Sequence, residues 1–200
     1  MLHAQPTETA SGSTPARHRH VRGQAMIEFA AVLLPLLMII VGIIQFGLIF
    51  GANVSLTNAA REGARAGTIY VYSGADKTTN DKNRCTAVLQ GAKSSFGLIA
   101  ASSPYFVAAD PCTTGHKVND YTWRNGDLTI AYCRPSPSPA APDDCAASST
   151  VLANDARRGY RMTVTLTYRS DIIVPFVGEI VSTDANGRMV QTARATMVIN

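Results

Sequence analysis

The longest feature of the sequence is an uncharged apolar stretch near its N-terminus. Residues Phe29–Ala60, 32 in all, contain no Asp, Glu, Lys or Arg, and the first 24, Phe29–Ala52, have Gln45 as their only strongly polar side chain. A helix of 24 residues rises about 36 Å, enough to cross a bilayer core of about 30 Å. Pro35 is tolerated in such a helix. The sequence therefore predicts a transmembrane helix over residues 24–52.

The next segment, residues 53–68, differs in composition. It is rich in alanine and glycine, and polar side chains interrupt any wide apolar stripe. Alanine favours helix, and Glu62 and Arg65 form an opposite-charge pair three residues apart. We expect the helix to continue through this segment, outside the membrane and only lightly packed on the domain that follows.

Residues 69–200 are long enough for one compact domain. Apolar positions at helical spacing predict a helix over Asp81–Ala101, and strict alternation predicts a strand over Arg161–Tyr168. Two further strands and a turn are predicted at Leu128–Cys133, Arg188–Ile199 and Asn186-Gly187. The fold class is α+β: a long N-terminal transmembrane helix continues into a small external domain, in which a helix packs on an antiparallel sheet.

The charges flanking the apolar stretch favour one orientation in the membrane. Residues 1–23 form a basic leader that contains Arg17, Arg19 and Arg22. Because cationic flanks favour the cytoplasmic side, we expect a cytoplasmic N-terminus and an extracytoplasmic C-terminal domain. A cleaved secretory signal is the alternative, but its apolar region spans about 7–15 residues, which is shorter than this stretch.

The remaining charges exclude a nucleic-acid partner. The formal net charge is only +4 at pH 7, and the basic residues form no run that would follow a phosphate backbone. The one cluster, Arg157, Arg158 and Arg161, is interpreted as a solvated face at the start of a strand.

The four cysteines all fall in the predicted external domain. Cys85, Cys112, Cys133 and Cys145 fit an oxidising compartment and two disulfides. Three pairings are possible, and we favour the nearest-neighbour one, Cys85–Cys112 and Cys133–Cys145. The separations of 27, 21 and 12 contain no Cys-x-x-Cys knuckle, which disfavours a zinc site.

A search for catalytic motifs finds no candidate. The sequence lacks Gly-x-Ser-x-Gly, His-Glu-x-x-His and the phosphate-binding Gly-x-x-x-x-Gly-Lys-Ser/Thr. His116, the only histidine outside the leader, lies in a polar loop and is interpreted as solvated. Asp184 and Gly187 indicate a hairpin turn rather than a calcium loop. We expect no enzymatic activity, no cofactor, no metal and no small-molecule substrate.

The junction between the leader and the apolar stretch carries the most specific pattern, and residues 22–29 read RGQAMIEF. Gly23 provides an unhindered peptide bond that a protease can reach. Glu28 lies about one turn into the predicted helix, where the helix dipole favours a negative charge. A carboxylate drawn into lipid needs a partner, such as a free amine or a basic side chain of a neighbouring copy.

Gly-x-x-x-x-Glu-Phe before an apolar helix resembles the processing site of type IV prepilins and pseudopilins. The longer segment over residues 22–68 is similar to the TadE/TadG-like family of tight-adherence (Flp) pilus systems, and to the shorter TadE-like type more than to TadG. Two parts carry this resemblance: Gln45-Phe46-Gly47 within the apolar stretch, and NAAREGAR over residues 58–65.

The resemblance implies a bacterial inner-membrane pseudopilin or minor pilin that acts in pilus assembly. A prepilin peptidase would cut between Gly23 and Gln24, and Glu28, followed by Phe29, would be the acidic fifth residue of the mature protein. The implied partners are the membrane, the prepilin peptidase, other pilins and pseudopilins, and pilus assembly platform proteins. Whether the protein enters the filament or stays in the membrane is open.

Whether Gly47 and Gly51 pack against another helix is open. They form a G-x-x-x-G pattern that favours close approach of another helix, although glycine is common in transmembrane helices. The sequence also fits a membrane-anchored extracytoplasmic adhesin or binding module without leader processing. In that case Gly23 is an ordinary loop glycine and Glu28 an ordinary acid at a helix start.

Overall fold

The computed structural model describes residues 21–70, 72–74, 76–96, 112–136, 138, 142–145, 151, 155–172 and 184–200. Most of the basic leader lies outside these ranges, as do the last residues of the helix expected over Asp81–Ala101. The polypeptide divides into two compact units, Met1–Val41 and Gly42–Asn200.

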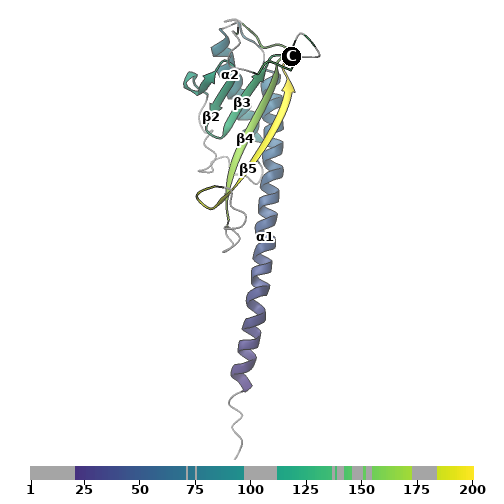
Figure 1. The fold of residues 1–200 in the computed structure, drawn as a ribbon, viewed down its shortest axis with the longest axis vertical. Coiled ribbons are helices and arrows are strands. Elements are labelled where there is room, and N and C mark those ends of the chain that lie inside the picture. Colours follow the sequence, from purple (N-terminus) through teal and green to yellow (C-terminus); the bar gives the residue numbers. More distant parts are fainter. Residues whose placement is uncertain are drawn as a thin grey trace, which may run out of the picture. The chain divides into compact units, whose positions relative to one another are not determined.

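The first element is one long helix. Helix α1 runs from Val21 to Thr68, 48 residues, and passes through Pro35 (Figure 1). The predicted anchor and its extension are therefore continuous in structure, and no break in the helix marks residue 52. Up to Ile44, each described side chain is exposed or half-buried, and Gln45 is the first buried one at 5% exposure.

The second unit contains a five-stranded sheet. Its strands are β1 (Lys117–Asn119), β2 (Thr122–Asn125), β3 (Leu128–Cys133), β4 (Arg161–Asp171) and β5 (Arg188–Val198). They lie in the order β1-β2-β3-β4-β5, each antiparallel to its neighbour. The pairing of β4 with β5 is regular over its whole length, from Arg161 opposite Val198 to Asp171 opposite Arg188. The sheet is an antiparallel meander, and the predicted α+β class is confirmed.

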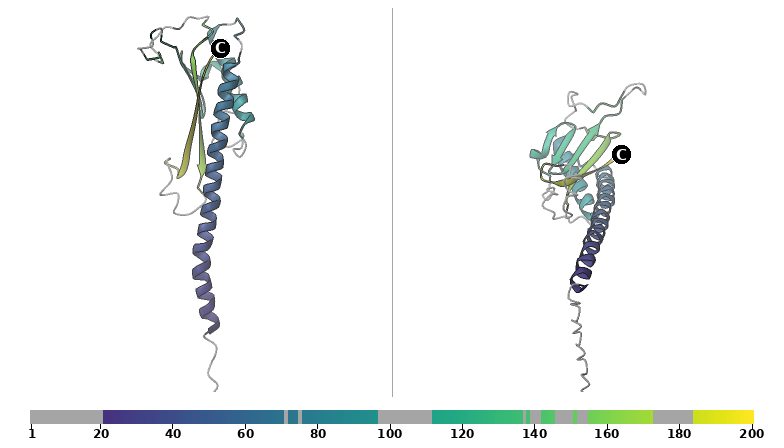
Figure 2. Two further views of the ribbon diagram at one scale, coloured as in Figure 1. Left: turned by 90° about the vertical axis from the view of Figure 1, so that its right-hand side faces the viewer. Right: turned by 60° about the horizontal axis from the view of Figure 1, so that its bottom comes forward.

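Alternation of side chains gives the sheet one buried face. In β3 and β4 the buried positions are every second residue, and they include Ile130, Val164 and Leu166, each 0% exposed. Helix α2 (Lys77–Ser94) and the C-terminal half of α1 cover this face (Figure 2). The opposite face of β4 and β5 carries threonines, of which Thr163 and Thr196 lie 2.9 Å apart between their Oγ1 atoms.

The elements differ from the sequence expectations in three places. Helix α2 begins before Asp81, because the Asp76 side chain accepts a hydrogen bond from Thr79 N (3.0 Å) and so caps the helix at Lys77. Strands β1 and β2 were not predicted. The turn at Asn186-Gly187 exists, with Gly187 N donating to Asp184 O and Gly187 at φ 72°, but it ends a longer connection rather than forming a two-residue hairpin.

Candidate functional site

The start of α1 carries the predicted processing residues. Gln24 Nε2 donates to Glu28 Oε1 at 3.0 Å, an exposed contact one turn apart. Phe29 is 67% exposed, and a Cβ placed on Gly23 meets no atom within 4 Å. The Gly23–Gln24 peptide bond lies in the first turn of α1, which begins at Val21, and Gly23 is exposed. The Glu28 carboxylate contacts only its own helix among the hydrogen bonds and ion pairs of the described residues.

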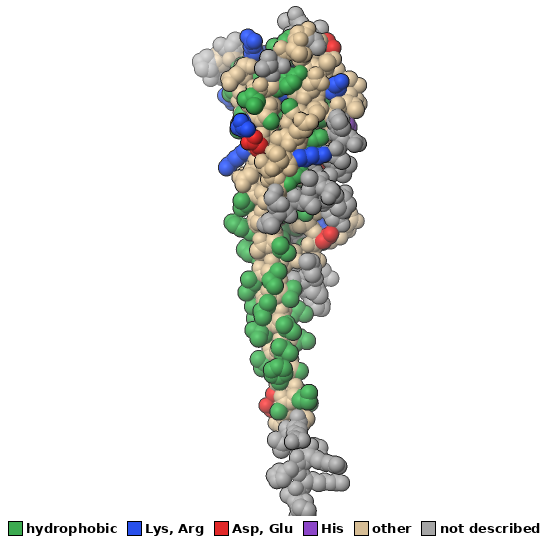
Figure 3. All heavy atoms as spheres, turned by 180° about the vertical axis from the view of Figure 1, so that it is seen from behind, with side chains coloured by type: hydrophobic (Ala, Val, Ile, Leu, Met, Phe, Trp, Pro, Cys, Tyr) green, Lys and Arg blue, Asp and Glu red, His purple; other side chains and the backbone are tan. Residues whose placement is uncertain are grey.

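The segment that follows is apolar, and Figure 3 shows hydrophobic side chains along the face in view. Large side chains on every side are exposed, among them Ile27 at 72%, Val32 at 68%, Leu34 at 65% and Ile43 at 68%. A helix that is hydrophobic all round is stable only in an apolar environment. Residues 23–44 rise about 33 Å, close to the thickness of a bilayer core.

Gln45 has a structural role that the sequence did not indicate. Its Nε2 donates to Asp171 O at the end of β4 (3.3 Å), and Gln191 Nε2 on β5 donates to Ile49 O of the helix (3.0 Å). The sheet therefore contacts α1 from Gln45 onward. Gly47 is open, since an added Cβ meets no atom within 4 Å, and Gly51 is half-buried. A role for these two glycines in helix packing stays a prediction.

The expectation that residues 53–68 pack lightly is wrong. Leu56, Ala59, Ala60 and Ala64 are all 0% exposed and belong to the core. These four residues recur at helical spacing and form a stripe of mostly small side chains along α1. A neighbouring element can pack closely against this stripe, although it is not a wide apolar face. This stripe lies within the segment that resembles the TadE/TadG-like family.

Glycines allow α1 and α2 to approach closely. A Cβ on Gly91 of α2 would lie 2.7 Å from Ala66 Cβ and 3.0 Å from Glu62 O. A Cβ on Gly63 of α1 would lie 3.0 Å from Val88 O. Two of these contacts are with backbone atoms, which cannot move aside as the end of a flexible side group can. Glycine at both positions is therefore a requirement of the helix crossing.

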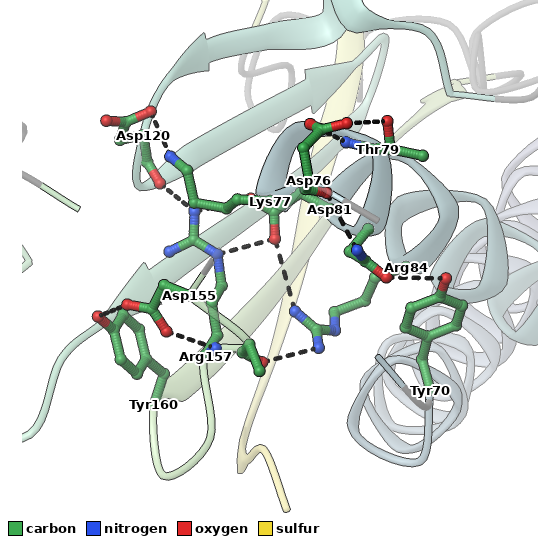
Figure 4. Close-up of polar contacts among 12 residues, drawn as sticks. Tyr70, Asp76, Lys77, Thr79, Asp81, Arg84, Asp120, Asp155, Arg157 and Tyr160 are labelled. Carbon is green, nitrogen blue, oxygen red and sulfur yellow. Dashed lines mark hydrogen bonds and ion pairs between the residues drawn. The ribbon is translucent and has the colours of Figure 1, made fainter. Parts of the chain in front are cut away.

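The arginine cluster is not a solvated face, because Arg157 is 0% exposed. Its Nε and Nη2 donate to both oxygens of Asp81 on α2, at 2.8 and 2.7 Å, and its guanidinium also donates to Asp120 O (Figure 4). Burial, the largest single effect, lowers the pKa of Arg157, but the hydrogen bonds that Arg157 donates to Asp81, together with the nearby negative charges, keep this pKa above its ordinary value. Arg157 is at φ 57°, and its own N donates to Asp155 Oδ1 (2.7 Å). Arg158 and Arg161 are exposed, as expected.

A second buried arginine shares the same carboxylate. Arg84 of α2 is 1% exposed, and its Nη1 lies 3.5 Å from Asp81 Oδ1. Tyr132 packs its ring against Arg157, with 4.2 Å from the guanidinium carbon to the ring centroid, and burial raises the pKa of its hydroxyl. Closer to the surface, Lys117 and Lys77 both bind Asp120. These two ammonium groups lower the pKa of Asp120 to about 2.

The structure joins Cys85 to Cys112 and Cys133 to Cys145, the nearest-neighbour pairing. The first disulfide ties α2 to the segment before β1, and the second closes the loop after β3. His116 ends a short 3₁₀ helix, where its Nδ1 accepts from Thr113 N (3.0 Å), so it caps a turn rather than lying free in solvent.

These features define an α+β fold, and its apolar N-terminal helix is compatible with a single-pass membrane protein. Within the described residues, one helix, Gly23–Thr68, is long and apolar enough to cross a membrane, with a mean hydropathy of 2.7 over an 18-residue window. Residues 23–65 match the model of the family described as TadE-like protein. The match covers the helix and none of the sheet. No curated protein and no solved structure matches this sequence.

Proposed function

We propose that this TadE-like protein is a non-catalytic, membrane-anchored pseudopilin or minor pilin that supports assembly of a tight-adherence pilus. In this proposal a prepilin peptidase cleaves after Gly23, the N-terminus is cytoplasmic, and the sheet domain lies outside the bacterial inner membrane. The observation that carries it is the exposed Gly23 in the first turn of a helix whose following residues are apolar all round. The family match over residues 23–65 supports a link to the pilus system.

Glu28 gives the proposal a mechanism. Among the described residues its carboxylate has one partner, Gln24 Nε2, which leaves its negative charge unpaired. An ionised carboxylate near the membrane is costly without a cation. Cleavage after Gly23 creates a free α-amino group at Gln24, one helical turn away. That amine, on the same or a neighbouring copy, supplies the cation, so processing and lateral association are coupled through Glu28.

The first experiment is intact mass and N-terminal sequencing of the protein from its native membrane. We expect a polypeptide that starts at Gln24. Gly23→Val places a branched side chain at the scissile bond and should block cleavage, whereas Gly42→Val, at another helical glycine whose added Cβ meets nothing within 4 Å, should be cleaved normally. A wild-type protein that starts at Met1 contradicts the proposal and favours an anchored binding module. A start beyond Ala52 removes the anchor and contradicts both.

The second experiment isolates the charge of Glu28. Glu28→Gln keeps an amide oxygen that can accept from Gln24 but removes the carboxylate. We expect normal processing and a loss of surface pili, counted by electron microscopy. Glu62→Gln is the matched control, because Glu62 is an acid of the same helix that already pairs with Arg65. Equal pilus numbers in wild type and Glu28→Gln would contradict the proposed role of the charge.

A further inference from the structure

The two disulfides lie in different surroundings. Cys85 and Cys112 are buried, at 1% and 3% exposure, and belong to the core. Cys133 is half-buried and Cys145 is exposed. Within the loop that this second disulfide closes, the described residues are 134–136, 138 and 142–144, and none of them is buried. The second disulfide therefore fixes a surface loop rather than the core, and binding residues concentrate in loops that a rigid scaffold holds in place.

Further contacts hold the two ends of this loop. Arg134 and Asp144 exchange two backbone hydrogen bonds, with N to O distances of 2.7 and 2.9 Å. The Arg134 side chain donates from Nε to the Tyr160 hydroxyl (2.8 Å). Within the loop, Ser136 N donates to Asp143 Oδ1 (3.3 Å). A loop that is already held in one conformation loses little freedom when a ligand binds, and this lowers the free-energy cost of binding.

The loop and the face of the sheet opposite its buried face line a cavity of about 830 Å³. This volume lies within the range of ligand-binding sites. The sheet contributes Arg161 and Thr163 of β4 and Thr196 of β5. The loop contributes two prolines, two serines and one acid, which are Pro135, Pro142, Ser136, Ser138 and Asp143. The cavity thus joins residues from an ordered surface loop to residues from two paired strands.

The charges of the cavity are balanced, and its other polar side chains are hydroxyls. Arg161 and Asp143 are the only charged residues among the described ones that line it, and Arg161 Nη1 lies 2.9 Å from Asp143 Oδ2. The hydroxyls of Thr163 and Thr196 lie 2.9 Å apart, between their Oγ1 atoms. A hydroxyl both donates and accepts hydrogen bonds. The ligand of matching chemistry therefore carries several hydroxyls and no net charge.

We propose that this cavity binds a neutral saccharide, a short segment of a glycan chain. Sugar hydroxyls can donate to Asp143, accept from Arg161, and do both with the threonine and serine hydroxyls. The paired charges provide no excess of positive charge to attract an acidic ligand, and the two prolines offer apolar surface to the C–H groups of the sugar rings. The site contains no residue of the processing segment, so saccharide binding is a function beyond the proposed role in pilus assembly.

The test uses the full-length protein with methyl-labelled threonine, in micelles of a detergent that has no sugar headgroup. Threonine methyl signals are recorded by NMR during titration with maltotriose, cellotriose and triacetylchitotriose. We expect saturable shifts of the Thr163 and Thr196 signals with a dissociation constant of about 1 mM or tighter for at least one sugar. Unmoved signals with all three sugars would overturn the proposal. Tighter binding of trigalacturonate, an acidic sugar, or of triglutamate, an acidic peptide, would also overturn it.

Variants separate binding from folding, with the Thr196 signal as the reporter. Thr163→Val keeps the shape of the side chain but removes its hydroxyl, and should weaken binding about two- to tenfold, the range of one hydrogen bond. Thr167→Val is the matched control, because Thr167 alternates onto the same face of β4 but does not line the cavity. It should bind as the wild type does. Equal affinities of the wild type and Thr163→Val, or equal losses in the two variants, would overturn the proposal.

A third variant tests the ordered loop. Replacement of both Cys133 and Cys145 by serine releases the loop and should weaken binding more than Thr163→Val does, because the loop must then be ordered when the sugar binds. This disulfide lies outside the core, so the fluorescence of the buried Trp123 should stay as in the wild type. Wild-type affinity in this folded double variant would contradict a site built on the disulfide-closed loop.

Discussion

Leu37 and Leu56 belong to the same helix, yet Leu37 is 50% exposed and Leu56 is 0% exposed. Around Leu37 the side chains are large and apolar on every face, which suits a lipid environment but provides no partner within the described protein. Around Leu56 the apolar side chains are mostly alanine, and they pack against α2 and the sheet. Hydropathy therefore identifies the first half of α1, whereas the spacing of small residues identifies the second.

The largest expected effect concerns the buried charges that hold the folded half together. Asp81→Asn removes the carboxylate that both buried arginines, Arg84 and Arg157, contact, and removal of one partner from a buried ion pair costs about 3–5 kcal/mol. The free energy of unfolding in detergent micelles, followed by the fluorescence of Trp123, should fall by that amount. Trp123 is the only tryptophan of the protein and is 0% exposed, so it reports on the core. Asp76→Asn, which retains an N-cap acceptor on α2, should change stability little.

The matched leucines test the comparison directly. Leu56→Ala removes a fully buried side chain and should lower the free energy of unfolding by about 2–5 kcal/mol. Leu37→Ala should leave the same measurement unchanged, because Leu37 is 50% exposed and is not one of the core residues. Equal losses in the two variants would mean that both halves of α1 contribute alike to the folded domain.

The helix crossing should respond to a single methyl group. Gly91→Ala introduces a Cβ at 2.7 Å from Ala66 Cβ, so α1 and α2 must move apart, at a cost of about 1–3 kcal/mol. Gly47→Ala adds the same methyl group to α1 where nothing lies within 4 Å and should not destabilise the domain. Comparison of the melting curves of these two variants shows where along α1 the helix begins to pack against the rest of the domain. A Gly91→Ala protein as stable as the wild type would contradict the close approach.

The smallest expected effect is a pH dependence of the free energy of unfolding. It arises at the start of α2, where Lys77 binds Asp120. The pKa of Asp120 is about 2, below its ordinary value of 3.8, because Lys117 and Lys77 favour the ionised carboxylate. A lowered pKa contributes stability above pH 4 that is lost as the pH falls through 2. Since Asp120 is partly exposed, the contribution is about 1 kcal/mol or less. Asp120→Asn should flatten the stability profile between pH 4 and 2, and an unchanged profile would show that these ion pairs do not stabilise the fold.

Much of the fold could be predicted from local patterns. The strict alternation over Arg161–Tyr168 falls within β4, and the apolar run over Leu128–Cys133 coincides with β3. Both patterns are visible because one face of each strand is buried. β1 and β2 are three and four residues long, too short for a clear period. A signal for β2 was present in Asn125-Gly126-Asp127, where Gly126 has φ 58° in the turn to β3.

The candidate site was only partly predictable for a different reason. The processing residues are contiguous, so their spacing is visible in the sequence. Arg157 was predicted to be solvated because nothing within the local sequence indicates that Asp81, 76 positions earlier, lies beside it. The stripe of Leu56, Ala59, Ala60 and Ala64 has helical spacing and could have indicated burial, but small side chains add little to hydropathy.

Strand β5 has a consequence for how such a protein matures. It supplies Ala193 and Ala195 to the core, and Gln191 reaches back to Ile49 of the first helix. The segment of α1 that emerges first from synthesis is therefore covered only when one of the last segments of the polypeptide arrives. Until then, α1 around Ile49 lacks its hydrogen bond from Gln191 of the sheet. The interval between synthesis of α1 and addition of β5 is thus a period in which a newly made copy exposes apolar surface to aggregation and to proteases.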